Sequence, residues 1–263
     1  MIADERRLLA LEVDAVFGLV PAPGGRPALR DGPVRAVLAW SPGARLLALA
    51  PGTLVPGTLV PDTTVPGTAA PDTTVPGTAA PGTAALDGDG QDYVPGERPD
   101  VLVRLAEALG GGAALEGGPS YVFPERLAAV RPSPLPVIVS DTAGRAAARR
   151  LVRPGNWPPG EWHELIEGRF GQWAMAVHGD EAVSICHSPA ANASAAEAGI
   201  WTREDFRGRR LAPAVVAAWS ERERRRRDVL FYSTSAANHA SQAVARALGL
   251  APLGWIWKVV TTT

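Results

Sequence analysis

The sequence contains very little cysteine and lysine, and it has no long apolar run. Cys186 is the only cysteine among 263 residues, so the chain forms no internal disulfide and a reducing compartment suits it. No stretch approaches the roughly 18 uninterrupted apolar residues that a membrane helix needs. Glu12 and Asp14 interrupt the apolar segment near the start, where a secretory signal would carry no carboxylates. We therefore expect a cytoplasmic protein without a membrane partner.

The chain also lacks an excess of charge of either sign. The formal net charge is -1, so the overall balance gives no reason to expect a nucleic-acid partner. Hydrophobic residues make up 46% of the chain and charged residues 20%, which is typical of a soluble globular protein. The 28 glycines and 25 prolines exceed what such a protein needs, and most of the excess lies in one segment.

That segment runs from Pro51 to Ala85 and consists of seven pentads, such as PGTLV, PDTTV and PGTAA. A proline at every fifth position removes backbone donors and forbids regular helix, and the segment offers almost nothing to bury. We expect a disordered insert over residues 51–90. A stacked repeat, a glycosylated stalk or an interaction segment are the alternatives, although pentads lack the apolar face that a solenoid needs.

The residues on either side of the insert, 1–50 and 91–131, form an N-terminal extension in which we find no catalytic constellation. Its apolar runs, bounded by proline and glycine, predict two helices and several short strands. The expected helices are 2–18 and 99–109, and the expected strands are 34–40, 46–50 and 121–123.

The C-terminal half, residues 132–263, has a richer alternation of strands and helices. A turn-prone tripeptide at residues 178–180, HGD, separates two apolar runs and predicts a β-hairpin. Together the segments predict a mixed α/β sheet. The expected strands are 136–140, 172–177, 181–187, 195–202, 229–233 and 253–260, and the expected helices are 142–151, 161–168, 210–226 and 238–248.

One stretch, from Ala198 to Pro213, carries the clearest chemical signal. A strand ends, a short loop follows, and a segment rich in arginine and glycine opens a helix near Arg210. The free N–H groups of the first helical turn and the helix dipole both favour a bound phosphate there. Arg207 and Arg209 add positive charge. Pro213 fixes the first turn, where its missing N–H has no partner to lose.

This stretch resembles the acetyl-CoA motif of the GNAT superfamily of N-acetyltransferases, Gln/Arg-x-x-Gly-x-Gly/Ala. Arg207 matches the first position and Ala212 the last, whereas Arg210 stands where the family usually has glycine. The resemblance continues in residues 230–250, where an asparagine precedes a helix that closes in Leu-Gly-Leu, and it covers roughly residues 132–263. It implies a mixed, mostly antiparallel twisted sheet flanked by helices, with the acyl-CoA site in this half.

The resemblance implies an N-acetyltransferase that uses acetyl-CoA as co-substrate and needs no metal. An amine of a small molecule or a peptide would attack the thioester directly. The acceptor stays open, as does the oligomeric state, a homodimer included. Glu197 is the candidate base. The residues implied to contact acetyl-CoA come from a strand, the motif and the last helix: Ile200, Trp201, Thr202, Arg207, Gly208, Arg209, Arg210, Leu211, Ala212, Asn238 and Ser241.

Ala245 occupies the position at which the family usually has a tyrosine that acts as the acid. Water, Ser241 or Tyr232 would then have to protonate the leaving thiolate. The same departure supports a second hypothesis, in which the protein is a non-catalytic acyl-CoA-binding regulatory module.

Other conspicuous residues have simpler interpretations. The four histidines show no metal-ligand spacing and Cys186 lies in an apolar strand, so packing is expected for both. The run from Glu221 to Arg227 resembles a basic patch, but its four-apart acid–base pairs favour a solvated last helical turn. Trp255 and Trp257 either pack in the core or line the acceptor pocket.

Overall fold

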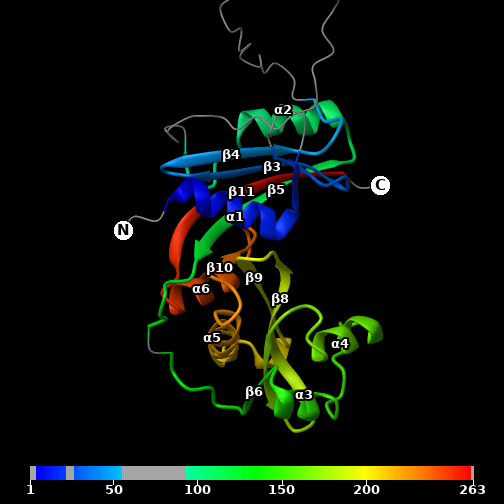
Figure 1. The fold of residues 1–263 in the computed structure, drawn as a ribbon, viewed down its shortest axis with the longest axis vertical. Helices are drawn as coiled ribbons and strands as arrows, with labels where there is room; N and C mark the ends of the chain where they lie inside the picture. The colour runs from blue at the N-terminus through cyan, green and yellow to red at the C-terminus, as the bar shows by residue number, and fades with distance from the viewer. Residues whose placement is uncertain (1–3, 22–26, 55–92, 129, 262–263) are drawn as a thin grey trace, which may run out of the picture.

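The computed structural model describes residues 4–21, 27–54, 93–128 and 130–261, so the predicted insert lies outside the described residues except for 51–54. Its main feature is one nine-stranded sheet in the order β4-β3-β11-β5-β10-β9-β8-β7-β6 (Figure 1). The strands are β3 (Val34–Ser41), β4 (Ala44–Leu49), β5 (Ala113–Val122), β6 (Val137–Val139), β7 (Trp173–His178), β8 (Glu181–Ala191), β9 (Ala195–Thr202), β10 (Val229–Ser233) and β11 (Ala251–Thr261).

Six α-helices of the described residues and a small second sheet surround the large one. The helices are α1 (Glu5–Phe17), α2 (Asp100–Leu109), α3 (Thr142–Ala148), α4 (Pro159–Ile166), α5 (Leu211–Glu223) and α6 (His239–Ala247). The small sheet pairs β1 (Leu19–Pro21) with β2 (Pro27–Leu29). Within the described ranges, no helix combines the length and the apolar character needed to cross a membrane.

The pairing within the large sheet is antiparallel at every step except between β9 and β10, which run parallel. Helices cover both faces of the sheet (Figure 1). This confirms the predicted fold class, a mixed and mostly antiparallel sheet flanked by helices. The predicted hairpin is also present, because β7 and β8 pair antiparallel on either side of the turn at residues 179–180.

The two faces of the sheet carry different helices, because alternate residues of each strand point to opposite sides. On one face, α5 packs Val215 and Trp219 on the core that contains Ala196 and Tyr232. On the other face, α1 buries Leu9 and Val13 against β3, β4 and β9. Helix α4 covers β7 and β8 further along the same face as α1. The middle of the sheet, around β9 and β10, is therefore enclosed from both sides.

Strand β5 is longer and more central than the sequence suggested. The expected strand covered 121–123, whereas β5 spans Ala113–Val122 and lies between β10 and β11. The two glycines that look like breakers are required by close contacts: a Cβ on Gly118 would lie 1.7 Å from the Thr234 carbonyl oxygen, and one on Gly117 would meet the Trp257 ring at 2.3 Å. Strands that precede residue 132 thus share one sheet with strands that follow it.

The two tryptophans of β11 belong to the core beneath α2. Trp257 is buried there and Trp255 packs partly buried against the same cluster, with the two rings stacked at 6.0 Å. Neither lines the cavity described below. The core interpretation therefore holds for both.

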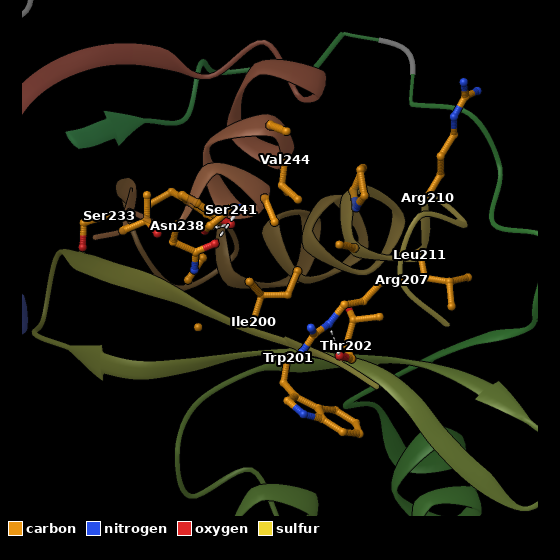
Figure 2. A pocket seen from close by; sticks show the side chains of 18 of the residues that line it. Ile200, Trp201, Thr202, Arg207, Arg210, Leu211, Ser233, Asn238, Ser241 and Val244 are labelled. Atoms are coloured by element: carbon orange, nitrogen blue, oxygen red, sulfur yellow. Dashed lines mark hydrogen bonds between the residues drawn. The ribbon is translucent and has the colours of Figure 1, made fainter. Parts of the chain in front are cut away.

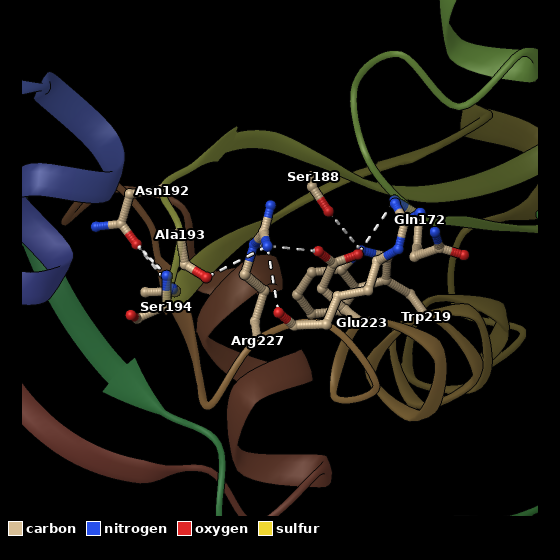
Figure 3. Close-up of polar contacts among 10 residues, drawn as sticks. Gln172, Ser188, Asn192, Ala193, Ser194, Trp219, Glu223 and Arg227 are labelled. Carbon is tan, nitrogen blue, oxygen red and sulfur yellow. Dashed lines mark hydrogen bonds and ion pairs between the residues drawn. The ribbon is translucent and has the colours of Figure 1, made fainter.

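The end of α5 differs from the solvated turn that the sequence suggested. Glu223 is 1% exposed, because its Oε2 accepts a hydrogen bond from the Gln172 backbone N–H at 3.1 Å and Arg227 approaches its Oε1 at 3.8 Å (Figure 3). One turn earlier, the Trp219 indole donates to the Ser188 hydroxyl at 3.0 Å. These contacts fasten α5 to β7 and β8, so the start of the same helix is held in place at the cavity.

Candidate active site

The site is a gap in the sheet where β9 and β10 part. The two parallel strands pair only from Ala195 to Glu197 on β9 and from Val229 to Phe231 on β10. Beyond these residues β9 continues to Thr202 with β8 on one side and a cavity of about 820 Å³ on the other (Figure 2). The residues of β9 along this stretch therefore have backbone groups that face the cavity instead of a neighbouring strand.

The cavity is lined by β9, the loop and first turn of α5, the end of β10, and α6. Eleven of the twelve residues that the sequence suggested lie on it, and Arg209 does not. The lining residues are Pro189, Glu197, Ala198, Gly199, Ile200, Trp201, Thr202, Phe206, Arg207, Gly208, Arg210, Leu211, Ala212, Pro213, Tyr232, Ser233, Thr234, Asn238, Ala240, Ser241, Ala243 and Val244.

The loop before α5 is organised around a buried aromatic ring. Phe206 is 4% exposed, and the guanidinium groups of Arg203 and Arg209 lie 4.5 and 4.6 Å from its ring centroid. Arg203 also bonds Glu181 at 2.6 Å and Asp205 at 2.7 Å. Arg209 is thus directed to the ring and away from the cavity. Arg207 folds the other way, with its Nε donating to the Thr202 carbonyl at 3.4 Å (Figure 2).

Arg210 adopts the backbone conformation that the family's glycine would favour. Its φ is 61° and its ψ 23°, and it is the only non-glycine residue of the described ranges with positive φ. This left-handed conformation costs roughly 1–2 kcal/mol for a residue with a side chain. Arg210 precedes the first turn of α5 without a side-chain cap, so the N–H groups of Leu211 and Ala212 begin a helix that opens on the cavity.

The last helix of the site presents short polar groups. Asn238 caps α6 by accepting a hydrogen bond from the Ser241 N–H at 3.0 Å (Figure 2). The Ser241 hydroxyl lies 2.6 Å from the Tyr232 hydroxyl. Ala245, one turn further along, is fully buried in the core. Burial raises the pKa of Tyr232 to about 12, so its hydroxyl keeps its proton at neutral pH and remains a hydrogen-bond donor.

Glu197 is the buried carboxyl group of the cavity, at the point where the two strands part. It is 6% exposed, and its Oε1 accepts hydrogen bonds from the Ser233 N–H at 2.5 Å and from the Ser233 hydroxyl at 2.8 Å. Burial raises the pKa of Glu197 to about 7, although the bonds from Ser233 act in the opposite direction. A carboxyl group that titrates near neutral pH can both accept and release a proton under working conditions.

Sequence reasoning missed the residues that act through tertiary contacts. Ser233 was seen only as the end of a strand, and Phe206 only as part of an arginine-rich loop. The sequence did contain an indication for Phe206, because an aromatic ring among several arginines is expected to pack against the guanidinium groups. No local signal identifies Ser233, because its partner Glu197 is 36 residues away in the sequence.

His187 and Cys186 fit the packing interpretation. His187 packs edge-on against Trp157 with ring centroids 5.2 Å apart, and burial lowers its pKa to about 4. Cys186 is buried, and burial raises the pKa of its thiol. In the described part of the chain, no three histidine, cysteine, aspartate or glutamate side chains gather as a metal site.

Comparison with known families agrees with the fold. Residues 127–251 match the family model described as an acetyltransferase (GNAT) domain. Residues 127–251 therefore form a domain of the GNAT acetyltransferase family. No curated protein matches the chain.

Solved structures of proteins named as GNAT or GCN5-related N-acetyltransferase proteins resemble the chain at low identity. A GCN5-related N-acetyltransferase-like protein from Streptococcus suis is 19% identical, with a TM-score of 0.43 over 63% of this chain and 69% of that chain. A GCN5-related N-acetyltransferase from Kribbella flavida is 14% identical, with a TM-score of 0.43 over 63% and 65%. A tandem GNAT protein from the clavulanic acid biosynthesis pathway is 16% identical, with a TM-score of 0.44 over 65% and 61%.

Proposed function

We propose that this protein transfers an acetyl group from acetyl-CoA to the amine of a small molecule or a peptide. Residues 132–263 hold the acyl-CoA, and the preceding residues cover the acceptor side. One observation carries the proposal: the cavity between β9 and β10 joins a cationic helix start at one end to the buried carboxyl group of Glu197 at the other.

The cationic end suits the pyrophosphate of CoA. The first turn of α5 offers backbone N–H groups and the positive end of the helix dipole, and Arg207 and Arg210 line the same end of the cavity. The unpaired side of Ile200–Thr202 suits the pantetheine arm, whose amides can pair with an open strand edge as a neighbouring strand would. A CoA molecule bound in this way extends its thioester towards β10.

The carboxyl end supplies the proton transfers. The acceptor amine must lose a proton to attack, and Glu197 is the group of the cavity whose pKa lies near neutral pH. The amine nitrogen then forms a bond to the acetyl carbon, the C–S bond breaks, and CoA leaves as a thiolate. Ala245 stands where the family usually has the tyrosine that acts as the acid. The hydroxyl pair of Tyr232 and Ser241 takes over this role and protonates the thiolate, because it reaches the cavity from the α6 side. In this scheme the reaction needs no covalent enzyme intermediate.

The binding test is calorimetric titration of the full chain with acetyl-CoA, CoA and ATP in parallel. Saturable binding of acetyl-CoA and CoA, and not of ATP, is the expected result. The variant Arg207→Gln removes a charge that lines the cavity, and Arg209→Gln is its matched control, because Arg209 rests on Phe206 outside the cavity. Loss of one charge-assisted contact is worth about 1.5–3 kcal/mol, so Arg207→Gln should weaken CoA binding roughly 10- to 100-fold. Equal affinities of the two variants would refute the site.

The second candidate is the acyl-CoA-binding regulatory module, which Ala245 favours because no hydroxyl stands at that position. Both functions require the same binding result. They separate in a second assay, which mixes the protein with acetyl-CoA and a panel of amines and follows the release of free thiol. Thiol release that depends on the amine excludes the regulatory module, whereas tight binding without release supports it.

A further inference from the structure

Helix α1 inserts a carboxyl group beneath the sheet. Glu12 is fully buried, and its Oε1 lies 2.5 Å from the hydroxyl of Ser120 on β5. Its Oε2 has no hydrogen-bond partner among the described residues. The helix is fixed at this position, because Asp14 accepts a hydrogen bond from the Asn192 side-chain amide at 2.6 Å, just before β9 begins. Burying an ionisable side chain costs free energy, so the position of this glutamate calls for a structural or functional explanation.

The strand register brings this carboxyl group to the one that lines the cavity. Ser120 on β5 pairs directly with Ser233 on β10, so their side chains share a face about 5 Å apart. Ser233 in turn donates two hydrogen bonds to the carboxyl group of Glu197. Glu12, Ser120, Ser233 and Glu197 therefore form one group of side chains, here called the carboxyl cluster, in which Ser233 is half-buried and the other three are buried.

The surroundings of the carboxyl cluster do not compensate two negative charges. Burial raises the pKa of both carboxyl groups, and the charge of Glu197 further raises the pKa of Glu12. Among the described residues, the charge of Glu197 also acts on Cys186 from β8 and on Tyr232 from β10, and both of these groups become anions when they ionise. The Oε2 of Glu197 also has no partner among the described residues. Burial and mutual repulsion both disfavour the ionised form, so ionising both carboxyl groups costs considerable free energy.

We propose that Glu12 is a positioning residue that acts through Glu197: the two carboxyl groups retain one proton between them, so that the cavity base carries the single negative charge of the cluster. Helix α1, which lies outside the matched family domain, would then be part of the acetyl-transfer machinery. The role in catalysis rests on the proposed function. The shared proton does not, because it is a property of the folded protein.

The shared proton is tested without turnover by infrared titration of the full chain, followed at the absorption of protonated carboxyl groups. The wild type should show two separate steps above the usual carboxylate range. In Glu197→Gln, the remaining step belongs to Glu12 and should move down from the upper wild-type step by about one pH unit or more. In Glu12→Gln, one step should remain, near the lower wild-type position. If the Glu12 step is unmoved in Glu197→Gln, the two groups do not interact and the proposal fails.

The catalytic consequence is tested by the pH profile of kcat/KM for thiol release. The wild type should show an additional inflection at the upper step, because loss of the second proton changes the charge beside Glu197. Glu12→Gln should lack that inflection and keep the acidic limb, and ionisation of the acceptor amine affects both proteins equally. Profiles that superimpose would overturn the catalytic role of Glu12. A protein with coupled infrared steps but no thiol release would instead refute the proposed function and leave the shared proton established.

Discussion

The cavity between β9 and β10 is cationic and exposed at one end, and carboxylic and buried at the other. Arg207 and Arg210 lie exposed at the start of α5, whereas Glu197 is 6% exposed and is covered by α1 and held by Ser233. Exposed charges act by attraction that salt screens, so only those close to the bound anion contribute strongly. A buried carboxyl group acts through its protonation state, which depends on each neighbouring atom. The first end suits binding and the second suits proton transfer.

The largest effect should come from breaking the carboxyl end while leaving the cationic end intact. Glu197→Gln keeps the size of the side chain and removes the proposed base, so kcat/KM should fall about 10²- to 10⁴-fold. Affinity for CoA, measured by calorimetry, should stay unchanged because Arg207 and the α5 turn are untouched. Glu221→Gln, an exposed position on α5, is the control and should retain full activity. If Glu197→Gln lowers affinity for CoA instead of turnover, the division of labour between the two ends is wrong.

The same variant should reveal the cost of the buried carboxyl group in stability. The folded-state pKa of Glu197 is raised to about 7, so the folded state binds more protons than the unfolded state above the usual carboxyl range. The free energy of unfolding of the wild type therefore falls as pH rises from about 4.5 to about 7. Glutamine does not titrate, so the advantage of Glu197→Gln should grow by about 3 kcal/mol between pH 4 and pH 8. Urea denaturation at the two pH values measures it.

A matched surface variant separates this effect from general charge changes. Glu116 is more than half exposed and pairs with Lys258 at 3.0 Å, so Glu116→Gln should change stability by less than about 1 kcal/mol at either pH. If Glu116→Gln gains as much as Glu197→Gln at high pH, the gain reflects net charge and not burial.

The two ends also differ in how far the sequence could reveal them. The residues of the cationic end lie within Ile200–Ala212 and in the neighbouring helix, so the family resemblance carried by this one stretch and by α6 was enough to predict ten lining residues. The carboxyl end joins residues from α1, β5, β9 and β10, and Glu12 lies 108 residues from its partner Ser120. No local periodicity encodes such a contact. The length of β5 was underestimated for a related reason. Its glycines make room for residues that only the fold brings close to them.

The smallest effect concerns Arg210, where the cationic end departs from its family. Arg210→Gly restores the usual residue and removes the strain at φ 61°, so the free energy of unfolding should rise by about 1 kcal/mol. Arg210→Ala removes the same charge and keeps the strain, which makes it the matched control. Calorimetry then decides what the arginine does: if charge dominates, both variants should lose CoA affinity about equally. Weaker binding by Arg210→Ala alone would mean that close approach of the backbone to the phosphates matters more than charge, and that this end is tuned by geometry as closely as the carboxyl end.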